Sequence, residues 1–144
     1  MTIEEIKVML KRYRFIAGEI SDLLEERQRL KSLAEKITPS LSHASTPSKE
    51  RDKMTAAVAN LIELKIYIEK RSKELLQART KAEMLLDRLP DERQRAVLKC
   101  YYFSKRTWEE CCVAMGYEWA QIHRIHSRAL NDLRKMIQND TPNL

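Results

Sequence analysis

Basic and polar side chains occur at helical spacing near the C-terminus, where four basic side chains but only one acidic side chain, Asp132, lie between Trp119 and Gln138. Cationic groups bind phosphate oxygens, whereas amides, imidazoles and other polar groups contact base edges in the DNA grooves. The residues that we expect to contact double-stranded DNA are Lys105, Arg106, Trp119, Ala120, Gln121, His123, Arg124, Ser127 and Arg128. Arg128, Arg106 and Lys105 would hold phosphates. Arg124 would face base edges, together with His123, Ala120 and Trp119.

Local sequence signals predict two helices, joined by a glycine turn, that would position these side chains. Thr107 followed three residues later by Glu110 is typical of a capping box at the start of a helix. Gly116 after Met115 is typical of a helix C-terminus, because glycine adopts the left-handed conformation there. A second helix follows, with apolar positions on one face at Ile122, Ile125, Ala129 and Leu133. A short helix, a glycine turn and a basic helix form the usual scaffold for entering a DNA major groove.

A wider pattern surrounds this pair of helices. It consists of Leu89-Pro90, Arg93, Arg95, Val97, Tyr102, Phe103, Thr107-Trp108-Glu109-Glu110, Met115-Gly116, Ala129-Leu130 and Leu133-Arg134. The pattern resembles region 4 of sigma-70-type factors over about residues 87–137. This resemblance implies a helix-turn-helix domain of the kind that binds the −35 promoter element. The sequence departs from that family at Lys105, where glycine is frequent, at Glu118, where serine or threonine is frequent, and at Trp119, where a polar or basic residue is usual.

The N-terminal half is organised in heptads. One row contains Ile6, Tyr13, Ile20, Arg27 and Ala34, and a second row contains Met9, Ile16, Leu23, Leu30 and Ile37. These rows predict a long amphipathic helix over residues 1–37, and a second run predicts another over residues 49–88. Arg71 interrupts the second run as Arg27 interrupts the first. Residues 38–48 are rich in serine, threonine and proline, which favours a flexible linker.

We therefore predict an all-α protein, with a long antiparallel helical hairpin followed by a helix-turn-helix domain over residues 89–144. Two long amphipathic helices must cover their apolar faces, and a second copy of the chain is one way to do so. The residues that we expect at a homodimer interface are Ile6, Tyr13, Ile16, Ile20, Leu23 and Leu30. A small chain with this organisation is similar to phage regulators of the ArpU/RinA type, which implies control of phage late genes.

The composition agrees with a helical protein that binds anionic partners. The 144 residues include only 2 glycines and 4 prolines, and the formal net charge is +6 with a pI of about 9.3. No stretch has the length and apolar character of a transmembrane span, and the N-terminus lacks an apolar signal core. The sequence thus predicts a cytoplasmic protein with no membrane partner.

The cysteines and histidines do not have the spacing of a metal site. Cys111 and Cys112 are adjacent, and His123 and His126 have two residues between them, whereas zinc ligands are more widely separated within each pair. We interpret Cys100, Cys111 and Cys112 as small buried apolar residues, with a metal or redox role as the less favoured alternative. No catalytic triad, carboxylate pair or phosphate-binding loop occurs, so we expect neither an enzyme nor a cofactor.

Two other functions fit parts of this pattern. Small terminase subunits of phages also join a helix-turn-helix to a helical oligomerisation segment, so a role in DNA packaging stays open. A module that docks on RNA polymerase, with little DNA affinity of its own, is the second alternative. Among the aromatic residues, Tyr101, Tyr102, Phe103 and Trp108 are expected in the core, whereas Trp119 could contact DNA, Tyr117 or a partner protein.

Overall fold

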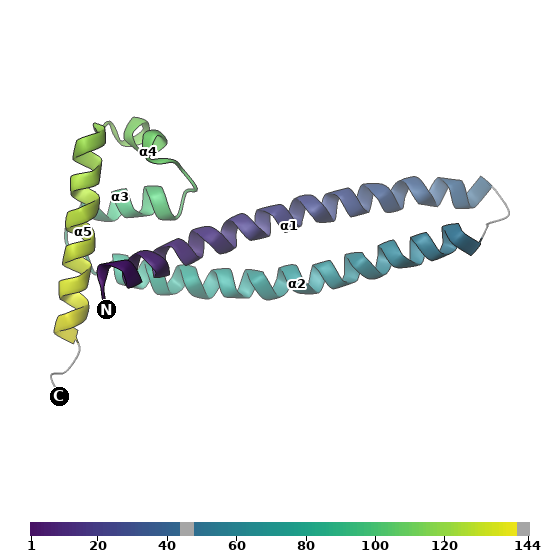
Figure 1. Ribbon diagram of the computed structural model, residues 1–144, viewed down its shortest axis with the longest axis horizontal. Helices are drawn as coiled ribbons and strands as arrows, with labels where there is room; N and C mark the ends of the chain where they lie inside the picture. Colours follow the sequence, from purple (N-terminus) through teal and green to yellow (C-terminus); the bar gives the residue numbers. More distant parts are fainter. Residues whose placement is uncertain (44–47, 141–144) are drawn as a thin grey trace. The chain divides into compact units, whose positions relative to one another are not determined.

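The computed structural model describes residues 1–43 and 48–140, and helix is the only regular secondary structure among them (Figure 1). The helices are α1 (Ile3–His43), α2 (Ser48–Leu86), α3 (Glu92–Tyr102), α4 (Trp108–Met115) and α5 (Trp119–Asp140). The predicted all-α class is confirmed. The scarcity of glycine and proline explains it, because these are the residues that most destabilise a helix interior.

The chain forms two compact units. Unit 1 contains Met1–Phe15 and Leu75–Leu144, and unit 2 contains Ile16–Glu74. This division differs from the predicted domains, which separated the whole first helix from the C-terminal part. The physical reason is that the first turns of α1 contribute to the core around α3 and α5.

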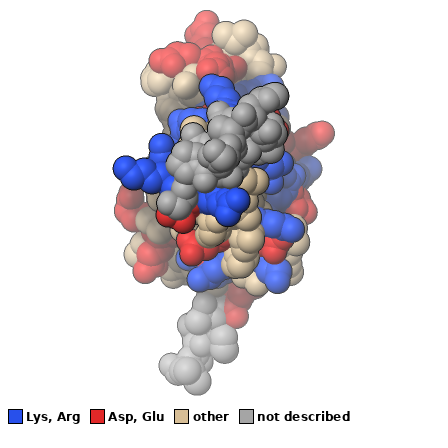
Figure 2. Space-filling view, turned by 90° about the vertical axis from the view of Figure 1, so that its right-hand side faces the viewer, with Lys and Arg blue, Asp and Glu red and all other residues tan. Residues whose placement is uncertain are grey.

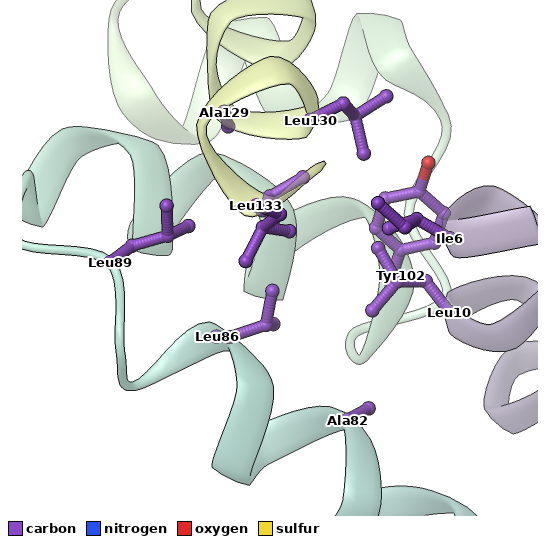
Figure 3. Close-up of a cluster of buried hydrophobic side chains, with 10 residues drawn as sticks. Ile6, Leu10, Ala82, Leu86, Leu89, Tyr102, Ala129, Leu130 and Leu133 are labelled. Carbon is purple, nitrogen blue, oxygen red and sulfur yellow. The ribbon is translucent and has the colours of Figure 1, made fainter. Parts of the chain in front are cut away.

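The core of unit 1 joins all its longer helices. It consists of Ile6, Leu10, Ala82, Leu86, Leu89, Leu98, Tyr102, Ala129, Leu130 and Leu133. In Figure 3, Ile6 and Leu10 lie beside Tyr102, and Leu86 and Leu133 point toward one another. Burying an aliphatic side chain of this size stabilises a fold by roughly 1.5–3 kcal/mol. This core therefore ties α1 and α2 to the helices that carry the predicted DNA contacts.

Arginine and aromatic side chains extend this core. The rings of Tyr13 and Phe103 meet edge to face with their centroids 5.0 Å apart. The Arg79 guanidinium lies over both rings, and its Nη1 donates to the Tyr13 hydroxyl over 3.2 Å. Arg14 lies 4.4 Å from the centre of the Tyr101 ring and donates to the Tyr101 carbonyl oxygen. Cation–π contacts of this kind add to the apolar packing between α1, α2 and α3.

The bounds of the long helices differ slightly from the predicted ones. α1 continues to His43, past Thr38 and Pro39, where we expected it to end at residue 37. Proline removes only one backbone donor, so it weakens a helix without always ending it. Residues 44–47 of the predicted linker lie outside the described residues. α2 ends at Leu86 rather than at Arg88, because the Arg88 and Leu89 amides donate to carbonyl oxygens three residues back.

Within unit 2, α1 and α2 lie side by side and run in opposite directions (Figure 1). Arg71, which interrupts the apolar heptad row, forms ion pairs with Glu19 on α1 and Glu74 on its own helix. Glu19 also accepts a hydrogen bond from the Tyr67 hydroxyl over 3.1 Å. The hydrogen bond from Arg71 lowers the pKa of the Glu19 carboxyl. A charge in the apolar row is therefore satisfied by a partner on the facing helix.

The predicted dimer interface is partly used within the single chain. Ile6, Tyr13 and Ile16 are buried, with exposed fractions of 0%, 7% and 2%. Ile20, Leu23 and Leu30 are half-buried. A second subunit cannot rest on the first three residues without displacing their own neighbours, so this part of the expected interface is not supported. Heptad rows identify the apolar side of a helix, but they do not identify which partner covers it.

Candidate nucleic-acid interface

The ends of α4 have the geometry that the sequence predicts. Thr107, with φ −72° and ψ 165°, accepts a hydrogen bond at Oγ1 from the Glu110 amide over 3.2 Å. Gly116 is left-handed, with φ 70° and ψ 29°, and its amide donates to the Cys112 carbonyl oxygen. The Tyr117 amide donates to the same oxygen over 3.1 Å. These bonds satisfy backbone groups that helix ends otherwise leave unpaired, and they fix the turn into α5.

A small core holds α4 against α3 and α5. Its fully buried members are Val97, Cys111 and Ile122, one from each of the three helices. Trp108 covers this core and stacks on the Tyr101 ring with the centroids 3.9 Å apart and the planes 8° from parallel. The expectation that Tyr101 and Trp108 serve as packing residues is confirmed. Apolar packing therefore sets the orientation of α5, which carries most of the predicted contacts.

α5 has one buried and one exposed face. The buried residues of α5 are Ile122, Ala129, Leu130 and Leu133. Of the predicted contact residues, Lys105, Arg106, Trp119, Ala120, Arg124, Ser127 and Arg128 are exposed, and Gln121 and His123 are half-buried. The structure thus brings the basic and polar side chains of α5 to its solvent-facing side. Seven of the nine predicted residues are therefore exposed to solvent.

Lys105 and Arg106 lie in the loop before α4. Lys105 has a φ of 53°, in the left-handed region that glycine adopts most easily. Arg106 is exposed, and its Nη1 donates to the Cys100 sulfur over 3.6 Å. The loop thus presents two cations ahead of the helix pair.

His123 is less accessible than its neighbours. Its ring lies 4.4 Å from the Trp119 ring and 4.8 Å from the Trp108 ring, measured between centroids. Its Nε2 is buried and makes no hydrogen bond within the described residues. Trp119 itself is 54% exposed, so its indole can still meet a ligand. Arg124 is therefore better placed than His123 to contact a base edge.

A pocket of about 310 Å³ lies between α3 and α5. Its polar and charged lining residues are Asp91, Arg93, Gln94, Gln121, Arg124 and Arg128. The sequence predicts the three from α5 as DNA contacts and shows Arg93 only as part of the sigma-like pattern, and it gives no signal for Gln94 or Asp91. No periodicity in either helix could have shown them, because the pocket depends on how α3 and α5 pack together.

One comparison identifies a family. Residues 37–134 match a family whose description reads "Protein of unknown function (DUF1492)". The chain belongs to the DUF1492 family. The matched residues include all of α2, α3 and α4, and α5 as far as Arg134. No curated protein and no solved structure gives a significant match.

The cysteines of this DUF1492 chain are packing residues in the described structure. Cys111 is fully buried, and its burial raises the pKa of the thiol to about 12. Such a thiol is a weak nucleophile at neutral pH, because almost none of it is ionised. Within residues 1–43 and 48–140, no three side chains of histidine, cysteine, aspartate or glutamate are grouped so that they could hold a metal ion.

On one face of the DUF1492 chain, positive and negative side chains are mixed (Figure 2). On the face in Figure 2, Lys and Arg side chains lie among Asp and Glu side chains, without a large area of one sign. The local excess of cations around Arg93, Arg124 and Arg128 therefore indicates where an anion could bind more specifically than the net charge of +6 does. Of the helices in the described part of the chain, none is both long enough and apolar enough to cross a membrane.

Proposed function

We propose that this protein binds double-stranded DNA in a sequence-specific manner through α5, as a transcription regulator of the phage type with a domain like sigma region 4. The observation that carries the proposal is the division of α5 into an apolar face packed on α3 and α4 and an exposed face with Arg124, Ser127 and Arg128. A rigidly packed helix with exposed arginines can enter a major groove without first reorganising.

The roles of the residues follow from their positions. Arg106 and Lys105 in the loop and Arg128 on α5 would bind phosphates and so set the position of the helix on DNA. Arg124 lies nearer the start of α5 and is exposed, so it would reach base edges, where a guanidinium pairs best with guanine. Trp119, at the first turn, would contact a sugar or a thymine methyl group.

We further propose that the protein acts as a homodimer. α2 carries aliphatic side chains at four-residue spacing that remain exposed in the single chain: Val58 at 43%, Ile62 at 55% and Ile66 at 62%. An apolar stripe of this kind favours a contact with a second copy. All three residues of this stripe belong to unit 2, whereas the buried Ile6 and Tyr13 belong to unit 1.

Light scattering at tens of micromolar tests the dimer. The wild type should be a dimer, and the double variant Ile62→Asp, Ile66→Asp should be a helical monomer because it places charges in the apolar contact. Val113→Asp is the control, since Val113 is 85% exposed on α4 and outside this stripe. A monomeric wild type would refute the dimer, and a ring of eight or more subunits would favour DNA packaging.

Selection from random double-stranded DNA followed by footprinting tests the function. A two-fold dimer should select an inverted repeat whose half-site centres lie about 10–10.5 base pairs apart, or a multiple of that, because both helices must enter major grooves on one side of the duplex. Failure to enrich any sequence would contradict specific binding. A single asymmetric site like a −35 element would contradict the symmetric arrangement.

One observation favours a second candidate function, docking on another protein such as RNA polymerase. Val113 and Trp119 are both exposed large apolar side chains, at 85% and 54%, close to the turn between α4 and α5. Retained polymerase binding by a chain that binds no DNA would support this candidate over the first.

A further inference from the structure

We infer that the pocket between α3 and α5 binds one nucleotide unit, with its phosphate on Arg93 and Arg128 and a hydrogen-bond donor of its base or sugar on Gln94. The inference deepens the proposed function and rests on it for its biological meaning, because Arg128 is also a proposed phosphate contact on DNA, and Arg124, which lines the same pocket, is a proposed base contact. The nucleotide unit could come from a DNA strand or from a free nucleotide.

The charge of the pocket favours an anion. Three guanidinium groups line it, and its one carboxylate, that of Asp91, is already used locally. Asp91 caps α3 by accepting the Arg93 amide at Oδ1 over 2.9 Å, and the same oxygen lies 3.9 Å from Arg93 Nε. Asp91 therefore does not neutralise all three arginines of the pocket. A guanidinium offers two parallel N–H donors, and this geometry matches two oxygens of a phosphate.

Gln94 supplies the second, independent observation. The residue is only 7% exposed, and its Nε2 donates to Asp132 Oδ2 over 3.0 Å. This bond fixes the orientation of the amide, because the reversed amide would place its oxygen against a carboxylate. The Oε1 atom is then buried and has no hydrogen-bond partner among the described residues. A buried acceptor without a donor is costly, so the site is more stable when a ligand supplies one.

These two features together restrict the class of ligand. A sulfate ion, like the dianionic phosphate ester of a nucleotide, has acceptors only and cannot satisfy Gln94 Oε1, so the donor has to come from another part of the ligand. A nucleotide carries a phosphate and, within the same small molecule, amine or hydroxyl donors. The volume of about 310 Å³ lies at the lower end of the usual range for ligand pockets and suits one nucleotide rather than a larger cofactor.

Calorimetric titration of the full chain with adenosine monophosphate, adenosine and inorganic sulfate, in the absence of DNA, tests the site directly. We expect adenosine monophosphate to bind about tenfold more tightly than sulfate, since one added hydrogen bond is worth about that factor, and adenosine to bind weakly. Equal binding of the nucleotide and sulfate, or no binding of either, would overturn the inference.

Variants separate the two contacts. Arg93→Gln should weaken the binding of the nucleotide and of sulfate alike, whereas Gln94→Met should lower the affinity for the nucleotide to that for sulfate. Lys81→Gln, an exposed position on α2 outside the pocket, should leave both unchanged. If Gln94→Met does not fold, NMR of the wild type decides. The Gln94 side-chain amide signals must shift with adenosine monophosphate, and unshifted signals at saturation would refute the contact.

Competition distinguishes the two sources of the nucleotide unit. If DNA uses this pocket, adenosine monophosphate should displace double-stranded DNA at the concentration at which it fills the pocket. Displacement would support the shared site, and undisturbed DNA binding would overturn it and leave a site for a free nucleotide only. Because the titration without DNA stands alone, failure of the pocket and failure of DNA binding produce different results.

Discussion

The Tyr102 hydroxyl on α3 lies 2.9 Å from Nε2 of His126 on α5, and this contact joins the two helices beneath the candidate interface. The Trp108 ring lies 4.8 Å from the imidazole on another side. Burial, with a smaller contribution from the charge of Lys7, lowers the pKa of His126 to about 4. The imidazole is therefore neutral in the folded protein at pH 7.

This buried histidine should make the fold sensitive to acid. Because the folded pKa lies below the ordinary histidine value of 6.5, the unfolded chain binds more protons between these values, and stability falls as the pH drops from 6.5 to about 4. After allowance for partial solvent screening, the titration of His126 should lower the free energy of unfolding by roughly 1–2 kcal/mol over this pH range. Urea unfolding at pH 7 and pH 4.5 measures this loss, and His126→Gln should reduce it.

Tyr102→Phe is the matched control for this prediction. It removes the hydroxyl but keeps the ring that helps to bury the imidazole. If burial is the main cause of the low pKa, this variant should retain most of the acid sensitivity. A variant as insensitive as His126→Gln would mean that the hydrogen bond, not burial, controls the titration.

Gly116 and Lys105 both have a positive φ, and substitutions at the two positions should differ in their effect on stability. A Cβ at Gly116 would meet no atom within 4 Å, so Gly116→Ala should destabilise only through the backbone, by about 1 kcal/mol. Lys105 already has an unfavourable φ of 53°, so Lys105→Gly should cost little or no stability. Thermal unfolding of both variants checks this pair. Equal destabilisation at both positions would contradict the backbone explanation.

The ion pair between Arg71 and Glu19 should be strongly coupled. Arg71→Leu leaves the carboxylates of both Glu19 and Glu74 without their counter-ion, whereas Glu19→Leu leaves Arg71 paired with Glu74 alone, so both should lower the unfolding midpoint and Arg71→Leu should lower it more. The double variant should be more stable than Arg71→Leu, because only the Glu74 carboxylate then lacks its ion pair. Additive losses in this cycle would show that the pair does not stabilise the contact between α1 and α2.

The sequence was sufficient to predict the local features of the C-terminal part. The Thr107 cap, the Gly116 turn and the apolar face of α5 depend on neighbouring residues and on helical spacing, so they can be read directly from the chain. The packing roles of Tyr101 and Trp108 were also predicted, since large aromatic residues beside a short helix usually cover its core.

Features that depend on tertiary packing could not be predicted. Ile6 fits its heptad row equally well whether the partner is α2, a second subunit or the core of unit 1, to which it belongs. Gln94 has no sequence signal as a pocket residue, because its burial and its bond to Asp132 arise only when α3 packs on α5. The same limit applies to the exposed stripe at Val58, Ile62 and Ile66.

Arg124 and Arg128 should differ in what they contribute to DNA binding. Arg124→Ala should cost roughly 1–3 kcal/mol on the selected site and reduce the preference for it over random DNA, whereas Arg128→Ala should weaken all sequences alike. Lys81→Ala, an exposed charge on α2, serves as the control for a general loss of one charge. Equal losses for Arg124→Ala on selected and random DNA would remove its assignment to base contacts.

The salt dependence of DNA affinity tests the central claim most directly. If four to six cationic side chains of each chain meet phosphates, a plot of log K against log salt should have a slope of about −4 to −5 per bound chain, because each contact releases counter-ions. Titrations of the purified full chain with double-stranded DNA at several salt concentrations provide this slope. A slope near zero, or no binding at low salt, would contradict the account.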